Sequence, residues 1–419
     1  MAALDISRSD DSMFRHLEDA DKRRDVEHVL VVGDYALING GQPKIAIDTA
    51  NLLADRGIGV TFFAACGPVI DALKRPEIEV ICLEQSDILS DENRLRAMRR
   101  GIWNGTAARR LRDTAERFDP KKTVLHCHGY AKALSPAIGP VLSNGPLASV
   151  YSMHEYFLAC PNGGFYDFQA NQICTRKPLG VDCLTTNCDA RKFAHKAWRV
   201  IRQAATIGPG RMPRGLKDVI TTSKFQGRVL APYLGQETRM HHVPNPLPSF
   251  DRPRVNSTAN EIFLFVGRLD PEKGCTQFAH AAQALGVKAV FVGDGREREN
   301  ILKANPEAEM LGWLSPDGVQ DQLARARALV FPSLWYEGFP LVPLEAISRG
   351  VPVVAGSWSA ASEAVVDGVN GAVYSEPSTA SLIEAIKRIG DLDGDKIALT
   401  MDLSPARHFN DLMYIYERL

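Results

Sequence analysis

The sequence predicts an α/β protein with two doubly wound parallel-sheet domains. Short β-branched runs alternate with longer helical patterns along almost the whole chain. Strands that are apolar on both faces and separated by helices indicate parallel sheets covered by helices on both sides. The strand-like runs fall into two series, and 419 residues suit two domains better than one.

The two series of strand-like runs lie on either side of a proline-rich stretch. The first is expected at residues 28–33, 60–65, 79–83, 123–127, 148–153 and 219–222. The second is expected at residues 262–267, 287–293, 308–311, 328–331, 351–355 and 371–374. In doubly wound domains the ligand site lies at the C-terminal ends of the strands. Functional residues are therefore expected in the loops that follow these runs.

Prolines 244, 246, 248 and 253 forbid a helix at the join and favour an extended linker. A final run with apolar residues at helical spacing predicts a closing helix. The expected organisation is a polar tail at 1–27, a first domain at 28–246 with a cysteine-containing insertion at about 158–190, a linker at 247–258, a second domain at 259–400 and a helix at 404–419.

The charge of the chain is balanced, because 49 basic residues face 50 acidic residues. A general nucleic-acid partner is therefore not expected, since such proteins show a large basic excess. The first 27 residues lack the apolar stretch of a signal peptide, and no run approaches the roughly 18–20 apolar residues of a membrane span. We expect a cytoplasmic protein.

The loop at residues 267–274 carries two cations, Arg268 and Lys273, between Gly267 and Gly274. It follows directly after an expected strand. A planar guanidinium and a compact ammonium at this place suit a diphosphate. The alternative is a surface loop whose charges are simply solvated.

A pair of carboxylates lies around an expected helix start in the second domain. Glu337 precedes Gly338 and Pro340, and Glu345 follows about two turns into the helix. Free amides at such a start can meet a phosphate or a sugar hydroxyl, while the carboxylates accept from hydroxyls. The alternative is helix capping and complementarity to the helix dipole.

Together, these two segments resemble retaining glycosyltransferases of family 4, which have the GT-B fold of two facing Rossmann-like domains with a deep cleft between them. The Glu-x7-Glu hallmark of that family matches Glu337 and Glu345, and its Gly-Arg-Leu-x-x-x-Lys-Gly loop matches residues 267–274. The resemblance continues at Asn245 and at residues 293–295, 357–363 and 367–371, and it covers most of residues 28–390.

The resemblance implies a hexosyltransferase that takes its sugar from a nucleotide-sugar donor, retains the anomeric configuration and needs no catalytic metal. Arg268 and Lys273 would hold the donor diphosphate, Glu345 the ribose, and Glu337 with the neighbouring amides the donor sugar. Expected catalytic residues are Glu337, His128, Arg268 and Lys273; expected donor contacts are Gly267, Arg268, Lys273, Gly293, Gly338, Phe339, Pro340, Leu341 and Glu345.

The first domain is the acceptor side in that family. Paired glycines, Gly40 and Gly41, precede an expected helix and match a family glycine pair. His128 matches a family histidine near the transferred sugar, and His154 is a second strand-end candidate. The alternative for each histidine is a structural role. The resemblance implies a glycan or lipid-linked acceptor in cell-surface polysaccharide or glycolipid synthesis.

Two basic segments in the first domain have two interpretations. Eight arginines between residues 94 and 117 face only Asp113 and Glu116, and an apolar stripe contains Leu95 and Met98. A second basic stretch covers residues 191–202. These segments are either ordinary surface helices that pack inward, or they dock to the anionic inner face of a cell membrane or to a lipid-diphosphate acceptor.

Four cysteines lie in the insertion: Cys160, Cys174, Cys183 and Cys188. Four thiolates suit structural zinc or an iron–sulfur cluster, although the Cys-x2-Cys pair of many such sites is missing. Free thiols or redox pairing are the alternatives.

Other classes of protein fit the sequence less well. A nucleotide-sugar epimerase of the same fold is not expected to combine the Arg–Lys loop with the glutamate pair. An NAD-dependent dehydrogenase lacks its Gly-x-Gly-x-x-Gly after the first strand. A non-catalytic nucleotide-sugar or glycan-binding protein remains the alternative from another class.

Overall fold

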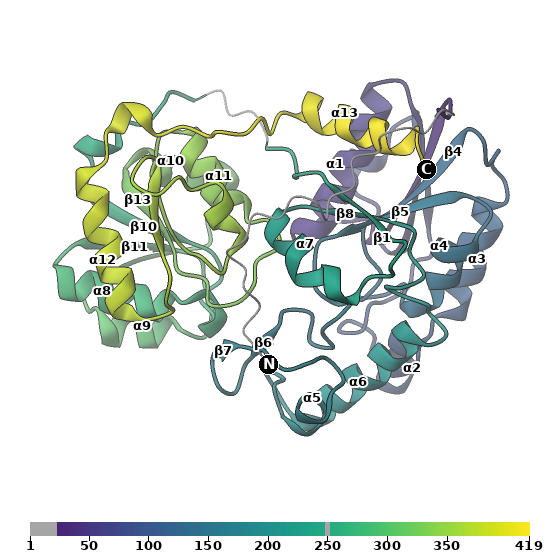
Figure 1. Cartoon of the computed structure of the whole chain (residues 1–419), viewed down its shortest axis with the longest axis horizontal. Coiled ribbons are helices and arrows are strands. Elements are labelled where there is room, and N and C mark those ends of the chain that lie inside the picture. Colours follow the sequence, from purple (N-terminus) through teal and green to yellow (C-terminus); the bar gives the residue numbers. More distant parts are fainter. Residues whose placement is uncertain (1–22, 248–251) are drawn as a thin grey trace. The chain divides into compact units, whose positions relative to one another are not determined.

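The computed structural model describes residues 23–247 and 252–419, which form two compact α/β units (Figure 1). The first unit holds the described residues up to Gly163, then Arg176–Pro246 and Pro405–Leu419. The second holds Gly164–Thr175 and Leu247–Ser404. Most of the expected N-terminal tail and part of the expected linker lie outside the described residues.

The sheet of the first unit is parallel throughout, in the order β3-β2-β1-β4-β5-β8-β9. All six strands expected from the sequence are present, and β9 is an addition. The strands are β1 (His28–Tyr35), β2 (Gly59–Cys66), β3 (Ile78–Cys82), β4 (Thr123–Cys127), β5 (Ala148–Met153), β8 (Asp218–Thr221) and β9 (Arg239–His242).

Helices flank this sheet in the pattern of a doubly wound unit. Leu53 of the first helix packs in one apolar cluster with Val29 and Phe62 from the strands, and Leu412 of the last helix joins it. The expected closing helix is therefore confirmed, and it belongs to the first unit. The helices are α1 (Gly41–Asp55), α2 (Arg94–Ile102), α3 (Gly105–Ala115), α4 (Gly139–Asn144), α5 (Val181–Thr185), α6 (Phe193–Ile207), α7 (Lys224–Leu230) and α13 (Pro405–Tyr416).

The sheet of the second unit has the order β12-β11-β10-β13-β14-β15 and is also parallel. Its two faces bury separate clusters: Phe263 and Phe265 enter one, and Leu264 the other. The elements are β10 (Ile262–Val266), β11 (Lys288–Val292), β12 (Glu309–Gly312), β13 (Ala326–Phe331), β14 (Val353–Gly356), β15 (Gly371–Tyr374), α8 (Cys275–Leu285), α9 (Arg298–Ala304), α10 (Pro316–Ala324), α11 (Leu341–Ser348) and α12 (Thr379–Arg388).

A short hairpin from the first half of the chain belongs to the second unit. It is formed by β6 (Tyr166–Asp167) and β7 (Gln172–Ile173), which pair antiparallel. Ile173 packs against the apolar cluster that contains Phe263 and Phe265. The single domain expected at 28–246 is thus interrupted at the hairpin, because its apolar contacts are made with the second sheet.

Candidate functional site

The loop after β10 packs closely against the loop after β13. Gly274 has a positive φ of 66°, and a Cβ there would lie 2.1 Å from the carbonyl oxygen of Pro332. The amide of Leu334 donates to the carbonyl of Glu272 at 2.8 Å. Only glycine permits this approach. The two segments predicted to bind the donor are therefore neighbours.

Glu337 lies at the centre of a polar network where these loops meet. Its Oε1 accepts from Lys273 Nζ, Ser333 Oγ and Trp335 Nε1, each at 2.7 Å. Lys273 Nζ also lies 5.0 Å from the centre of the Trp335 ring. The side chains of Glu337 and Lys273 are only 13% and 17% exposed. The pair is thus largely shielded from water.

The pKa of Glu337 is lowered from its ordinary value, although burial alone would raise it. The charge of Lys273 and the hydrogen bonds from Lys273, Ser333 and Trp335 outweigh the burial. Glu337 is therefore a carboxylate at neutral pH. A shielded carboxylate of this kind can accept hydrogen bonds from hydroxyl groups.

Arg268 lies on the same loop as Lys273, with its side chain 49% exposed. Its guanidinium pairs with Asp270 and, at 3.1 Å, with buried Glu272. Arg296, from the loop after β11, pairs with Asp270 at 3.4 Å. The fork of Arg268 is thus oriented by carboxylates of its own loop. Arg296 is a further cation that the sequence analysis did not select.

Gly267 and Gly293 bring the loops after β10 and β11 together. A Cβ on Gly293, whose φ is +132°, would lie 1.9 Å from the carbonyl oxygen of Gly267. The amide of Leu269 donates to the carbonyl of Asp294 at 2.9 Å. This backbone packing explains why glycine stands at 293. A contact between Gly293 and the donor stays a prediction.

Glu345 lies about one turn into α11, and not two as expected, because the helix begins only at Leu341. Pro340 precedes the helix in an extended conformation. Glu345 Oε2 accepts from Gln320 Nε2 at 3.0 Å, and Gln320 is held in turn by Arg349 at 2.8 Å. The first turn of a helix carries amides without intrahelical partners, which suit an anion. Phe339 and Leu341 flank this start, partly exposed.

The hairpin after Gly163 contributes to this region. A Cβ on Gly164 would lie 3.0 Å from the Trp335 ring, and the rings of Phe165 and Tyr336 are 6.1 Å apart. Trp335 is the residue that donates to Glu337. The hairpin of the cysteine-containing insertion therefore packs against the loop that precedes Glu337, and no motif in the sequence had indicated this contact.

The two candidate histidines of the first unit touch each other. His128 Nδ1 lies 3.1 Å from His154 Nε2, and their rings stack at 5.3 Å. The ring of His126 lies 4.0 Å from that of His128, tilted by 34°, and His126 Nδ1 hydrogen-bonds with the Tyr416 hydroxyl of α13 at 2.6 Å. Burial lowers the pKa of all three, in His154 to about 4. All three are therefore neutral at pH 7.

Gly40 and Gly41 mark the start of α1, and a Cβ would meet nothing within 4 Å at either. The adjacent Gln42 donates from Nε2 to the carbonyl of His128 at 2.8 Å. Gln42, His128 and His154 line one small cavity. The structure thus brings the start of α1 and the two histidines together. Their role toward an acceptor stays a prediction.

Asp34, at the end of β1, fixes the loop that follows His128. Its carboxylate accepts from the amides of Lys132, Ala133 and Leu134 at 3.1, 2.8 and 2.8 Å. Burial raises its pKa against the lowering effect of these amides. This residue was not selected from the sequence, because an isolated strand-end aspartate carries no signature.

The four cysteines of the insertion are divided between the two units. Cys174 lies in the hairpin of the second unit, and the others lie in the first. Cys183 and Cys188 place their sulfurs 3.4 and 3.0 Å from Lys196 Nζ. Within residues 23–247 and 252–419, no group of three or more His, Cys, Asp or Glu is arranged to hold a metal ion. Zinc or an iron–sulfur cluster here stays a prediction, which metal analysis of the purified protein would decide.

Two doubly wound parallel sheets, with a cationic loop and a glutamate pair after strands of the second, define a GT-B glycosyltransferase architecture. Residues 260–391 match the family model described as glycosyl transferases group 1. The matched residues all lie within the second unit.

Curated relatives resemble the chain over part of its length. A lipopolysaccharide 1,2-N-acetylglucosaminetransferase of Salmonella typhimurium is 32% identical over 157 residues, 33% of this chain and 41% of that protein. A UDP-Gal:alpha-D-GlcNAc-diphosphoundecaprenol alpha-1,3-galactosyltransferase of Escherichia coli is 33% identical over 145 residues, 31% of this chain and 36% of that protein. The chain thus spans less than half of these relatives.

Solved structures match over almost the whole chain. Sucrose-phosphate synthase from Thermosynechococcus elongatus superposes with a TM-score of 0.63 at 15% identity, covering 93% of this chain and 95% of that one. The Anabaena protein HepE, solved in complex with UDP, gives 0.59 at 15% identity, with 94% and 100% covered. At such identities the likeness is one of fold.

Proposed function

We propose that the protein is a retaining hexosyltransferase that uses a nucleoside-diphosphate sugar. The observation that carries the proposal is the shielded, ionised Glu337, held by Lys273, Ser333 and Trp335 beside the loop of Arg268. A carboxylate that accepts from sugar hydroxyls next to two cations suits a sugar joined to a diphosphate.

In the proposed reaction, the bond between the anomeric carbon and the diphosphate oxygen breaks. An acceptor hydroxyl oxygen forms its bond to that carbon on the same face, and its proton passes to the leaving phosphate. Arg268, Lys273 and the first amides of α11 stabilise the charge that develops on the diphosphate. Glu345 accepts from the ribose, and Glu337 positions the sugar. In this proposal the cationic side chains neutralise the charge of the leaving diphosphate, as a bound metal ion does in metal-dependent transferases.

The acceptor in this proposal is a glycan or a lipid-linked glycan of the cell surface. The names of two relatives support this class, since one is a lipopolysaccharide transferase and the other is named for a diphosphoundecaprenol-linked substrate. The paired histidines His128 and His154 and the start of α1 are the proposed acceptor side. Neutral imidazoles there can exchange hydrogen bonds with sugar hydroxyls.

The test is thermal stabilisation of the protein by a panel of nucleoside diphosphates, with UDP first because one relative is named for a UDP-sugar and HepE was solved in complex with UDP. A ligand that binds only the folded state at 100 times its Kd stabilises by about 2.7 kcal/mol. We expect one nucleotide to raise Tm strongly. Arg268→Ala and Glu345→Ala should abolish the shift, and Arg298→Ala, an exposed arginine on α9, should keep it.

Stabilisation that survives both site variants would place the nucleotide elsewhere and contradict the proposed donor site. Stabilisation by every nucleotide, or by none, would contradict the proposal and favour a non-catalytic protein of the same fold. Sugar transfer to extracted acceptors, measured on the same samples, separates an enzyme from a binding protein.

A further inference from the structure

Helix α6 is inverted: its buried residues are polar, and its exposed face is apolar. Phe193, Ile201 and Ile207 are 48%, 55% and 47% exposed. Small residues at 197 and 204 continue the same face at helical spacing. The buried residues of this helix are Lys196, Arg202, Gln203 and Thr206. An amphipathic helix normally faces the core with its apolar side, so this arrangement requires a cause.

The cause lies in the polar contacts beneath the helix. Lys196 Nζ reaches the sulfurs of Cys183 and Cys188, and Arg202 donates to the carbonyl oxygens of Ala131 and Pro161 at 2.9 and 3.3 Å. Rotating the helix would take Lys196 and Arg202 away from these partners, and leaving a buried cation without a partner is costly. These buried polar contacts therefore keep the apolar face of α6 exposed.

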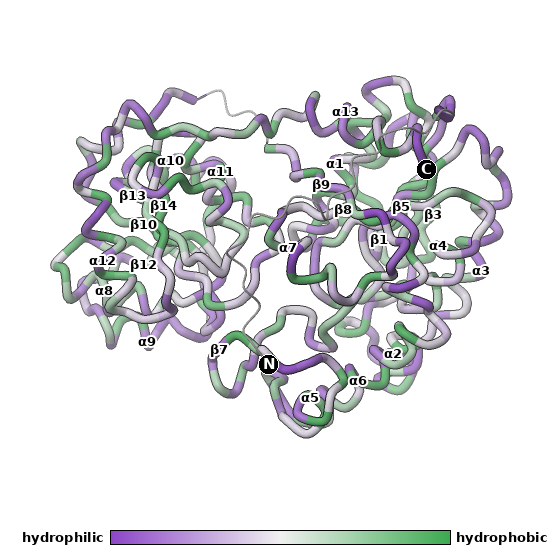
Figure 2. The backbone as a smooth tube through the Cα atoms, viewed as in Figure 1, coloured by the Kyte–Doolittle hydropathy of each residue, from purple (hydrophilic) through white to green (hydrophobic). Residues whose placement is uncertain are grey.

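Helix α2 extends this apolar surface. Trp198 of α6 donates from Nε1 to the carbonyl of Met98 at 3.1 Å, and a Cβ on Gly101 would lie 2.7 Å from the Trp198 ring. Figures 1 and 2 show α5, α6 and α2 along one border of the first unit. Of the fifteen large apolar side chains exposed among the described residues, nine lie in this region: Leu89, Leu95, Met98, Trp103, Val181, Leu184, Phe193, Ile201 and Ile207. We name these nine residues the apolar surface.

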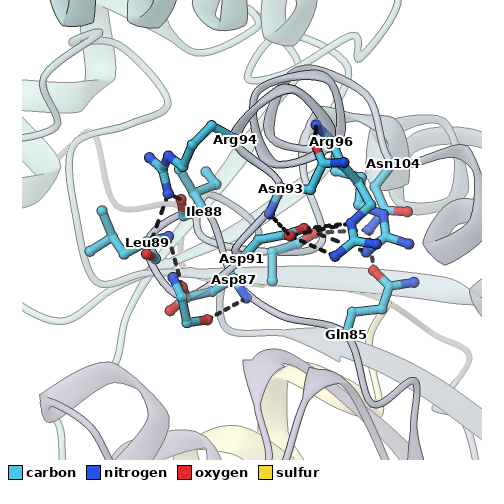
Figure 3. A network of polar contacts seen from close by, with 12 residues as sticks. Gln85, Asp87, Ile88, Leu89, Asp91, Asn93, Arg94, Arg96 and Asn104 are labelled. Atoms are coloured by element: carbon cyan, nitrogen blue, oxygen red, sulfur yellow. Dashed lines mark hydrogen bonds and ion pairs between the residues drawn. The ribbon is translucent and has the colours of Figure 1, made fainter.

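Exposed arginines lie on α2 and on α3, the next helix along the chain. Figure 3 shows the start of α2, where Arg96 pairs with buried Asp91 at 2.7 Å and Arg94 donates to the Ile88 carbonyl at 3.0 Å. These contacts fix α2 to the unit. The remaining arginines of α2 and α3 point to solvent, and four of them have no acidic partner among the described residues: Arg99, Arg109, Arg110 and Arg112.

We propose that the apolar surface docks on an anionic lipid bilayer. Exposed aromatic and aliphatic side chains, together with the exposed arginines of α2 and α3, match the boundary between acyl chains and anionic headgroups. A second copy of this chain fits less well, because a symmetric contact would bring the arginines of both copies together. No helix of the described residues is long and apolar enough to cross a membrane, and surface docking requires none.

The experiment uses the full chain and vesicles of phosphatidylcholine containing increasing fractions of phosphatidylglycerol. We expect co-sedimentation that rises with the phosphatidylglycerol fraction and weakens with added salt, since the attraction is partly electrostatic. Nucleotide stabilisation, measured in the same samples, keeps this test separate from the proposed transferase function.

Two variants address the two parts of the surface. Reversing Arg99, Arg109 and Arg110 to glutamate should lower vesicle partitioning about 100-fold or more, since each basic residue near an anionic surface contributes roughly fivefold. The matched control reverses Arg298, Lys303 and Arg325, which are exposed on the second unit. Ile201→Ser should also weaken binding, and Leu302→Ser on α9 is its control.

Equal losses in the variants and their controls would overturn the proposal, as would a wild-type protein that does not bind anionic vesicles. A dimer in solution that Ile201→Ser dissociates, without lipid binding, would assign the surface to a second copy instead. Unchanged circular dichroism and unchanged nucleotide binding in each variant would exclude unfolding as the reason for a loss.

Discussion

At Glu337, burial and its partners act on the pKa in opposite directions. Burial raises the pKa, whereas Lys273, Ser333 and Trp335 lower it, and the lowering prevails. The folded state thus holds an anion whose energy depends on one neighbouring cation. Such a pair is strongly destabilised when a single partner is removed.

We predict that Lys273→Met destabilises the protein by about 3 kcal/mol at pH 7. In the wild type, the lowered pKa of Glu337 contributes stability above its unfolded pKa, and this is lost as pH falls through the folded value. Without Lys273, burial raises the pKa, so the cost is greatest at neutral pH and shrinks toward pH 4. Urea unfolding of both proteins at several pH values measures this difference.

The double variant Lys273→Met with Glu337→Gln is the control. It removes the buried charge together with its partner, so it should recover most of the lost stability at pH 7. A penalty for Lys273→Met that is the same at pH 4 and pH 7 would contradict an ionised Glu337.

The second prediction at this scale concerns transfer. Glu337→Ala should reduce the transfer rate by at least about 100-fold, because the sugar loses its carboxylate, while nucleotide binding stays nearly intact. Rates with a nucleotide-sugar donor, set beside nucleotide-dependent Tm shifts, separate the two effects. Normal turnover would remove Glu337 from the donor-sugar site.

At the scale of elements, β4 and β5 end in a layer of buried imidazoles. His126, His128 and His154 all have a lowered pKa, chiefly because burial disfavours the charged ring. In the unfolded chain these imidazoles are protonated below about pH 6.5, whereas in the folded layer they stay neutral. Acidification therefore acts directly on these two strand ends.

We predict that stability of the first unit falls as pH drops from about 6.5 to 5. Each histidine that is protonated only in the unfolded chain changes the free energy of unfolding by up to about 1.4 kcal/mol per pH unit. His154→Gln should reduce the slope by up to that amount, whereas the exposed His280→Gln should not change it. Hydrogen exchange of the β4 amides reports the local stability. Equal slopes in both variants would contradict a neutral His154.

Most strands could be predicted from the sequence, because fully apolar runs such as the one after His28 leave few alternatives. Strand β9 was missed because its sequence, Arg239–His242, is polar. The hairpin was missed because two-residue strands carry no periodicity. The sequence did not indicate which side of α6 is buried, since Lys196 and Arg202 take that side through contacts distant in sequence.

The two segments proposed to bind the donor were selected through spacing, since Arg268 with Lys273 and Glu337 with Glu345 are local patterns. Their partners were not found. Trp335 and Ser333 lack any signature, and Gln320 reaches Glu345 from another helix. Residues that orient a functional group come close to it only in the folded structure. The sequence alone therefore indicates the functional group and not the residues that hold it.

At the scale of the whole molecule, a net charge of −1 hides an uneven distribution. Arginines gather on α2 and α3, whereas Arg268 and Arg296 of the second unit lie within carboxylate networks around Asp270 and Glu272. Overall charge therefore excludes little about partners. Local surfaces decide which anion is attracted where.

The chain passes between its two units four times, at Gly163, Thr175, Pro246 and Ser404. The second unit is consequently not one continuous segment of the chain. A recombination event that copied only residues 247–404 would leave behind the hairpin that packs against Trp335 and Tyr336. An exchange of the second unit between related proteins would have to include the hairpin, so the insertion and the second unit are expected to evolve as one heritable block.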